Sequence, residues 1–339
     1  MKPVRHVAHA RAGLLGNPSD LYEGRVIALA LANFRARVTL APAEHFEIVP
    51  GADDRLVFPS LREGAAALAA HGCEDGVRLL RAALEQLVAR RGGLADLPVG
   101  DPRLRFRIAY ETDIPRQVGF AGSSAIITAA LRALAEWFEL RLAPAELAEL
   151  ALACETDELG ITAGPMDRVI QAYQGLLWMD FAPPRGAHAY RRLDPALLPP
   201  LFVAWDPRGG EPSRKLHGDV RGRFLRGDAD VRRAIASLPA LADEGLRCLE
   251  RADRAGLERL LVRNFELRAS IYPPSPVDDA LVQLARAAGT VAKLCGSGGA
   301  VLGLMPEGDG WPRLEASYAA AGFGIARASV APPVAESAV

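Results

Sequence analysis

Hydrophobic and polar residues alternate along some segments of this chain and recur every three to four residues along others. Alternation is typical of strands, and the longer period is typical of helices. Together with turn signals, the first pattern predicts strands over residues 4–10, 26–33, 37–40, 46–49, 104–110, 175–181, 201–205, 301–305 and 323–329. The second pattern predicts helices over residues 76–90, 124–138, 143–156 and 277–288, and four more between residues 212 and 270.

The order of these elements indicates an α+β fold in two halves. A dinucleotide-binding fold would show a series of strand–helix–strand units and a Gly-x-Gly-x-x-Gly loop after a strand, and the chain has neither. The Pro–Pro–Arg–Gly run at residues 183–186 is typical of a linker or a sharp turn. We therefore expect the domain boundary near residues 182–195, with one domain over residues 1–190 and the other over 191–339.

Composition and charge narrow the class of protein. The 339 residues suit two domains of ordinary size; half of them are apolar, and the formal net charge is −1. This charge gives no basic field that would favour nucleic acid or an anionic membrane as a partner. The first 13 residues lack the apolar core of a signal peptide, and no run reaches membrane-spanning length. We expect a cytoplasmic protein, and the pattern does not indicate its oligomeric state.

The cysteines also exclude some classes. They are widely separated and form no Cys-x-x-Cys pair, which argues against a structural zinc site and against a disulfide scaffold. We expect reduced, buried thiols at Cys73, Cys154, Cys248 and Cys295.

The most informative segment is IPRQVGFAGSSAIIT, over residues 114–128. Glycines there allow backbone N–H groups to approach a ligand closely, and Ser123 or Ser124 can cap the helix that follows. The start of a helix attracts phosphate. The common phosphate loop has a Lys beside its Ser or Thr, whereas Ala125 follows here. A bound polyphosphate would therefore be neutralised by the helix dipole, a metal ion and arginine.

Two further segments are rich in turn residues. Residues 11–20 present Arg11, Asn17, Ser19 and Asp20 after a predicted strand. These side chains either shape a turn or bind the hydroxyl groups of a sugar. Residues 293–300 hold the run Gly296–Ser297–Gly298–Gly299 before another strand. That run is either a tight connection or a second backbone surface for phosphate or substrate.

Between these loops lies a segment with two acids of interest, Glu155 and Asp167, among other acids. Phosphoryl transfer needs charge neutralisation, a metal ion and a group that orients the attacking hydroxyl. Glu155 could hold Mg²⁺ together with Ser124, because that ion prefers hard oxygen ligands. Asp167 could accept the hydroxyl proton. Both acids could equally be ordinary surface residues.

The order of these motifs resembles the GHMP kinase superfamily, whose members carry an N-terminal substrate segment, a Pro-x-x-x-Gly-Leu-Gly-Ser-Ser-Ala loop and a late glycine-rich segment. The similarity covers about residues 5–305. Here the loop reads Gly–Phe–Ala–Gly–Ser–Ser from Gly119, which is one residue longer. In that longer loop, and in GLLGNPSD, ELGITAG and CGSGGAV, the chain is similar to one branch of the superfamily, the glucuronokinases.

The resemblance implies a two-domain GHMP kinase-like fold, with a nucleotide-binding α/β domain first, an α+β domain second and the active site between them. It implies an ATP-dependent kinase that phosphorylates the anomeric hydroxyl of a sugar acid. Asp167 and Arg11 match the catalytic pair, and Ser124 and Glu155 match the Mg²⁺ ligands. The implied ATP-binding residues are Gly119, Phe120, Ala121, Gly122, Ser123, Ser124 and Ala125. The implied substrate-binding residues are Asn17, Ser19, Asp20, Arg168, Gly296, Ser297 and Gly298.

A sugar-acid carboxylate needs a cation, ideally a bidentate arginine. Arg116, Arg168 and Arg25 are the candidates, and the sequence does not choose among them. Within the same superfamily the alternatives are a kinase for another sugar, such as galactose, galacturonate or a heptose, and a decarboxylase. A catalytically silent homologue is a further alternative.

Overall fold

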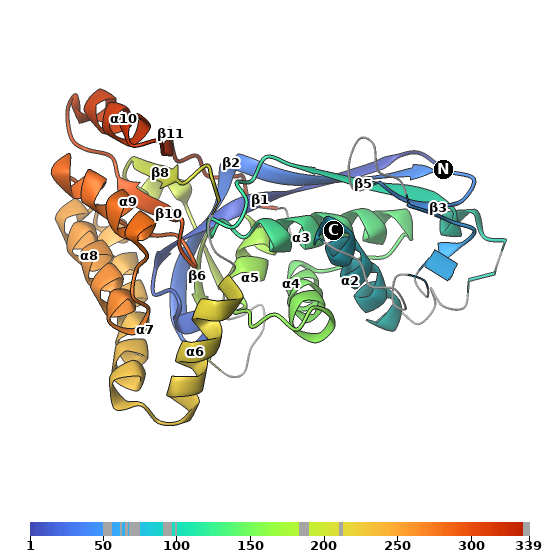
Figure 1. Cartoon of the computed structure of the whole chain (residues 1–339), viewed down its shortest axis with the longest axis horizontal. Helices are drawn as coiled ribbons and strands as arrows, with labels where there is room; N and C mark the ends of the chain where they lie inside the picture. The colour runs from blue at the N-terminus through green and yellow to red at the C-terminus, as the bar shows by residue number, and fades with distance from the viewer. Residues whose placement is uncertain are drawn as a thin grey trace.

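The computed structural model describes residues 1–49, 56–61, 63–64, 67, 75–90, 97–98, 100–182, 190–209 and 213–334. Within these residues the strands form two sheets (Figure 1). The first sheet has seven strands in the order β4–β3–β5–β2–β6–β7, with β1 also paired to β2. Neighbouring strands are antiparallel except for β3 and β5. The strands are β1 (Val4–Leu15), β2 (Arg25–Pro42), β3 (Phe46–Val49), β4 (Leu56–Phe58), β5 (Phe106–Thr112), β6 (Leu176–Asp180) and β7 (Tyr190–Leu193).

The long strand β2 organises the first sheet, because it pairs with β1 and with two shorter strands in succession. Residues 25–29 pair with β6, and residues 36–42 pair with β5. A segment from near the C-terminus fills the interval between them. Leu31 lies opposite Val330, and the Ala32 N–H donates to the Ser329 carbonyl oxygen at 2.7 Å. The Asn33 side chain joins the same segment, since its amide donates to the Arg327 carbonyl oxygen at 2.8 Å.

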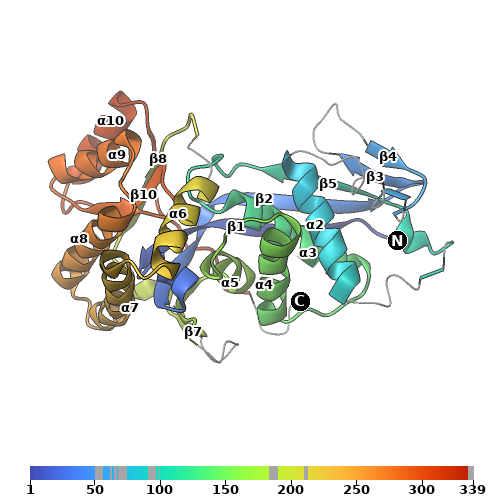
Figure 2. The same cartoon turned by 60° about the horizontal axis from the view of Figure 1, so that its bottom comes forward.

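Helices cover one face of this sheet, as Figures 1 and 2 show. α3 (Gly122–Trp137) packs along β1 and β2 and is buried over almost its whole length, because Ala, Ile and Leu fill most of its positions. α2 (Asp75–Arg90) and α4 (Pro144–Ala153) pack against α3, and α5 (Met166–Tyr173) packs beside α4 and reaches β1. Short helical turns connect these elements: η1 (Ser19–Tyr22), η3 (Pro102–Leu104), the π-helical η4 (Cys154–Glu158) and η6 (Pro195–Leu197).

The second sheet has four strands among the described residues, in the order β11–β8–β10–β9. α8, α9 and α10 pack on it around a small core that includes Phe202, Leu281, Val301 and Tyr318. α7 packs against α8 and also reaches β2 of the first sheet. The strands are β8 (Leu201–Trp205), β9 (Ala292–Leu294), β10 (Ala300–Leu304) and β11 (Gly324–Arg327). The helices are α6 (Ser213–Leu225), α7 (Ala229–Glu250), α8 (Arg254–Ile271), α9 (Pro276–Ala287) and α10 (Gly310–Ala320).

The predicted α+β class is confirmed, and several elements differ from the prediction. The two strands predicted over residues 26–33 and 37–40 are one strand, because the polar Asn33 bonds to a neighbouring segment and does not end the strand. In the part of residues 212–270 that the structure describes there are three helices, because Pro239 lies inside α7 and does not separate two helices. The analysis of periodicity did not predict β4, β7, β9, α5 or α10.

The predicted linker at residues 183–186 and Cys73 lie outside the described residues. The other three cysteines are free thiols, as expected; Cys154 and Cys295 are buried, whereas Cys248 is partly exposed, contrary to the prediction. The division into residues 1–190 and 191–339 stays a prediction. Across the described chain, no helix combines the length and the apolar character needed to cross a membrane.

Candidate active site

An arginine–carboxylate pair joins the first strand to the start of α5. Arg11 lies on β1, and its Nε and Nη2 donate to Oδ1 and Oδ2 of Asp167 at 2.6 and 2.7 Å. Such bidentate geometry fixes both side chains. The Arg11 side chain is 6% exposed and that of Asp167 is 17% exposed. The sequence predicted that these two residues act together, and the structure brings them into direct contact.

Both glycine-rich loops meet beside this pair. Nη1 of Arg11 donates to the carbonyl oxygen of Gly119. A Cβ atom on Gly296 would lie 2.6 Å from that same oxygen and 2.7 Å from Arg11 Nη1, so no side chain fits there. The Gly13 N–H donates to the Cys295 carbonyl oxygen at 2.9 Å. Three segments far apart in the sequence are thus held together by backbone contacts, and glycine allows the closest of these approaches.

The two serines at the start of α3 face an acid. Oγ of Ser123 and Oγ of Ser124 each donate to Glu155 Oε1 at 3.0 Å. The prediction that one of them caps the helix is wrong. The N-cap is Ala121, whose left-handed backbone (φ 60°) begins the helix without a side-chain cap. The serine hydroxyls are used for Glu155, which lies in η4 and is fully buried.

Glu155 also pairs with Arg168, through Oε2 and Nη2. Burial and the nearby charge of Arg11 lower the pKa of Arg168 to about 9. Among the described residues, no group of three or more His, Cys, Asp or Glu is placed to hold a metal ion by itself. Magnesium in kinase sites is commonly held by one or two carboxylates together with substrate phosphates and water. The carboxylate of Glu155 and the hydroxyl of Ser124 are hard oxygen donors that fit such a site.

Asp20 is a third acid near the start of α5 and, like Glu155, it is buried. Its Oδ2 accepts a hydrogen bond from the Met166 N–H at 3.3 Å. Burial, and then the charge of Asp167, raise the pKa of Asp20 to about 6. An acid with this raised pKa is ready to gain donors from a ligand, because its surroundings do not fully stabilise its charge.

Asn17 and Ser19 support the turn that carries Asp20. Lys293 Nζ donates to Asn17 Oδ1 at 2.7 Å and to the Gly13 carbonyl oxygen at 2.8 Å. The Ser19 hydroxyl donates to the Arg25 carbonyl oxygen at 3.0 Å. The Asn17 carbonyl oxygen accepts from Asn264 Nδ2 at 3.0 Å.

Lys293 and Asn264 were missed by the sequence analysis. Lys293 is the first residue of the segment 293–300 that holds the second glycine loop, and its position next to that loop was the available signal. Asn264 lies on a helix with no motif around it. Complete burial lowers the pKa of Lys293 to about 7.

The three arginines considered for a carboxylate differ in their surroundings. Arg168 is buried and paired with Glu155. Arg25 donates to Asp243 Oδ2 of α7 at 2.6 Å. Arg116 is exposed.

The aromatic residue of the first loop is buried. Phe120 stacks on Phe34 with ring centroids 5.5 Å apart, and Trp205 meets Phe120 at 6.4 Å. The Ala121 carbonyl oxygen accepts from Gln171 Nε2 at 2.9 Å. These contacts connect the loop to β2, to β8 and to α5, so the loop has a fixed support on several sides.

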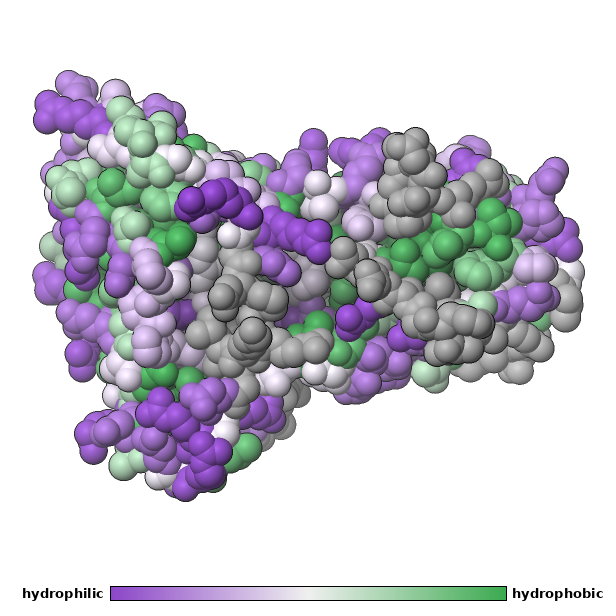
Figure 3. Space-filling view, in the orientation of Figure 1, coloured by the Kyte–Doolittle hydropathy of each residue, from purple (hydrophilic) through white to green (hydrophobic). Residues whose placement is uncertain are grey.

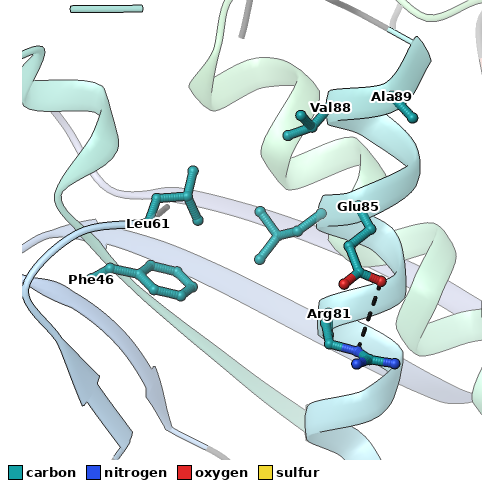
Figure 4. A pocket seen from close by; sticks show the side chains of 7 residues that line it. Phe46, Leu61, Arg81, Glu85, Val88 and Ala89 are labelled. Atoms are coloured by element: carbon teal, nitrogen blue, oxygen red, sulfur yellow. Dashed lines mark ion pairs between the residues drawn. The ribbon is translucent and has the colours of Figure 1, made fainter. Parts of the chain in front are cut away.

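A separate cavity of about 240 Å³ lies between α2 and the β3 side of the first sheet (Figure 4). Its two charged residues, Arg81 and Glu85, pair with each other at 3.8 Å. Figure 3 shows apolar residues gathered on the half of the molecule that holds α2 and β3. The cavity contains none of the glycines and acids described above. Phe46, Leu61, Leu84, Val88 and Ala89 complete its lining.

Several known proteins are similar to this chain in sequence or in fold. The profile described as "GHMP kinases N terminal domain" matches residues 78–175, and "GHMP kinases C terminal" matches residues 238–313. "Glucuronokinase 1" of Arabidopsis thaliana is 36% identical over 97% of this chain and 92% of its own length. "Probable glucuronokinase 2" of the same plant is 38% identical over 89% and 84%. The structure of Lactococcus lactis galactokinase complexed with galactose shares the fold, with a TM-score of 0.78 and 13% identity over 97% of this chain and 93% of that one.

Proposed function

Because the chain belongs to the GHMP kinases, we propose that it is an ATP-dependent sugar-1-kinase whose acceptor is the anomeric hydroxyl of D-glucuronate. The products are glucuronate 1-phosphate and ADP. The observation that carries this proposal is the bidentate Arg11–Asp167 pair beside two glycine-rich loops. Phosphoryl transfer requires positioning and charge stabilisation more than covalent chemistry. A carboxylate, a guanidinium and closely packed loop backbone are suited to those two tasks.

In the proposed reaction, Asp167 accepts or positions the proton of the anomeric hydroxyl while the hydroxyl oxygen attacks the γ-phosphorus of ATP. The bond from that phosphorus to the β,γ-bridging oxygen breaks, and ADP leaves. Arg11 orients the Asp167 carboxylate through two hydrogen bonds and stabilises the charge that develops on the transferred oxygens. The exposure of Asp167, which is greater than that of Arg11, supports its role as the group that meets the substrate.

We assign the binding of ATP, Mg²⁺ and the sugar to residues in and beside the loops. Backbone N–H groups of the first loop and the start of α3 would bind the phosphates of ATP, through Gly119, Phe120, Ala121, Gly122, Ser123, Ser124 and Ala125. Ser124 and Glu155 would hold Mg²⁺, which neutralises phosphate charge when bound. The sugar would contact Asp20 and the turn and loop around it, including Asn17, Ser19, Arg168, Gly296, Ser297 and Gly298.

A substrate panel tests the proposal. The protein is incubated with ATP, Mg²⁺ and one sugar at a time, and ADP release is measured for glucuronate, galacturonate, glucose, galactose and a heptose. Phosphorus NMR then shows whether the new ester is anomeric. Turnover with glucuronate and an anomeric phosphate is the expected result. Turnover with neutral hexoses but not with uronic acids would overturn the glucuronate assignment and favour a kinase for another sugar.

A further inference from the structure

One buried arginine near the candidate site has no acidic partner. Arg268 lies on α8 and is 4% exposed. Its Nη2 donates to the Ser297 carbonyl oxygen at 2.7 Å, and its guanidinium lies 5.4 Å from the centre of the Tyr272 ring. No Asp or Glu of the described residues forms an ion pair with it. The charge of nearby Asp278 offsets part of the cost of burying this guanidinium, but no carboxylate of the described residues contacts it directly. The guanidinium is therefore suited to gain an anion from a ligand.

The other buried arginines are already compensated. Arg11 and Arg168 each pair with a carboxylate. Arg132 has no carboxylate, but it donates to three carbonyl oxygens, those of Val7, Gln171 and Ala172, at 2.8 to 3.0 Å. Among the described residues, Arg268 donates to one carbonyl oxygen, that of Ser297. Its nearby acid, Asp278, accepts from the Gly299 N–H at 2.7 Å and the Ser275 N–H at 3.1 Å.

The position of Arg268 on α8 connects it to the sugar side of the site. Asn264, one helical turn earlier, donates to the Asn17 carbonyl oxygen and accepts from the Gly16 N–H at 2.7 Å. Tyr272, one turn later, interacts through its hydroxyl with Tyr22 of η1. Residues four apart share one face of a helix. Arg268 therefore lies on the face of α8 that meets the turn around Asp20, and it also contacts the second glycine loop.

We propose that Arg268 binds the carboxylate of the sugar acid and thereby selects uronic acids over neutral sugars. This assignment rests on the proposed function. In glucuronate the carboxylate is carried by C5, which is separated from the anomeric carbon by the ring oxygen alone, so its partner must be a group other than Asp167 that lies within the span of one sugar ring from it. Arg268 is placed for this role, because it contacts the carbonyl oxygen of Ser297, and the preceding Gly296 lies against Arg11, the partner of Asp167. A guanidinium can bind a carboxylate with two parallel hydrogen bonds.

The test compares an acid with its neutral amide. KM and kcat are measured for glucuronate and for glucuronamide in the wild type and in Arg268→Gln. Because a charge-assisted hydrogen bond contributes about 1.5–3 kcal/mol, we expect the KM for glucuronate to rise about 10–100-fold in the variant. The KM for glucuronamide and the KM for ATP should change little. The preference for the acid over the amide should therefore be lost.

Arg263→Gln is the matched control, because Arg263 lies on the same helix and is exposed beside Glu266. It should keep the preference of the wild type. Arg268→Lys retains the charge and loses the fork of donors, and we expect it to raise the KM for glucuronate about 3–10-fold. This second variant decides the question if Arg268→Gln does not fold.

The outcomes separate the two proposals. A wild type that turns over glucuronate, with a folded Arg268→Gln or Arg268→Lys variant of unchanged acid preference, overturns the role of Arg268 alone. An equal loss for glucuronate and glucuronamide also overturns it, because it points to a structural role. A wild type that does not turn over glucuronate overturns the proposed function and the assignment of Arg268 with it.

Discussion

Two arginine–carboxylate pairs meet at the start of α5, and they differ in how much solvent reaches them. The consecutive residues Asp167 and Arg168 have different closest partners: Asp167 pairs with Arg11 of β1, and Arg168 pairs with Glu155 of η4. A longer contact of 3.6 Å between Arg168 Nη1 and Asp167 Oδ2 links the two pairs. The carboxylate of Asp167 is 17% exposed, whereas that of Glu155 is 1% exposed. Asp167 can therefore be reached by a small ligand as the structure stands, whereas Mg²⁺ would reach Glu155 only by displacing a serine hydroxyl or the Arg168 guanidinium that now contacts it.

The pKa values of the two arginines reflect this difference. Burial alone would lower the pKa of Arg11, but the charge and hydrogen bonds of Asp167 outweigh burial and raise it. The pKa of Arg168 is lowered to about 9, first by burial and then by the charge of Arg11. The Arg11–Asp167 pair is therefore suited to chemistry, and the Arg168–Glu155 pair is suited to holding the start of α3, where Mg²⁺ would bind.

The largest effect on activity is expected when the more accessible pair, Arg11–Asp167, is broken. Asp167→Asn should lower kcat about 10²–10⁴-fold, because a general base contributes this much. The variant should remain folded but be less stable, because Arg11 is 6% exposed and loses its charged partner, while an amide oxygen and the Gly119 carbonyl oxygen remain as acceptors. Steady-state ADP release and thermal unfolding measure the two effects. Asp157→Asn, an exposed acid in η4, is the control. A rate near that of the wild type would remove Asp167 from the mechanism.

Breaking the closed pair should lower stability as well as weaken the proposed binding of Mg²⁺. Glu155→Gln leaves the buried Arg168 with only the longer contact to Asp167, at 3.6 Å, as an ion pair. Removing one partner of a buried ion pair typically lowers the free energy of unfolding by about 3–5 kcal/mol. Urea unfolding of this variant beside Asp167→Asn gives the comparison directly. If Asp167→Asn proves to be the less stable of the two, the division into a reactive and a structural pair is wrong.

The acid near α5 that belongs to neither pair, Asp20, should make the stability of the protein depend on pH. The pKa of Asp20 is raised from 3.8 to about 6, mainly by burial. The folded state therefore holds this proton more tightly than the unfolded state. The stabilisation is fully present below pH 4 and is lost as the pH rises through about 6.

At pH 7, the free energy of unfolding of Asp20→Asn should be about 1–3 kcal/mol higher than that of the wild type. The difference should disappear below pH 4. The same variant should raise the KM for the sugar. Urea unfolding at several pH values measures the first effect. A variant that is less stable than the wild type at pH 7 would show that the ionised carboxylate is well stabilised in the folded protein.

The smallest expected effects come from the two serines on Glu155. Each hydroxyl makes one hydrogen bond to this acid, but Ser124 is buried and Ser123 is exposed. A single hydrogen bond contributes about 0.5–1.5 kcal/mol. Ser124→Ala should therefore raise the Mg²⁺ concentration needed for half-maximal rate about 2–10-fold, and Ser123→Ala should raise it less. Titration of activity with Mg²⁺ ranks the two; the reverse order would exchange their roles.

The sequence predicted the fold class and the main segments of the site because each lies in a short, distinctive motif. Arg11 and Asp167 could be paired by resemblance although 156 positions separate them. Contacts made by single residues without a motif were not predictable. Asn264 and Arg268 occur in a helix whose sequence shows only periodicity, and their importance comes from what α8 faces. The predicted serine cap on α3 was wrong for a related reason, because the hydroxyls of Ser123 and Ser124 donate to a buried acid of η4, Glu155.

The position of Ser329–Ala331 against β2 has a consequence for synthesis of the protein on the ribosome. Chains generally begin to fold from the N-terminal side as they emerge. The interval in the first sheet between β5 and β6 is closed by residues from the far end of the chain, where the Ala331 N–H donates to the Ala30 carbonyl oxygen at 2.9 Å. A ribosome-bound chain that ends before residue 329 therefore leaves the middle of β2 without this partner. The first half of the protein reaches its final pairing only when nearly all of the second half has been made.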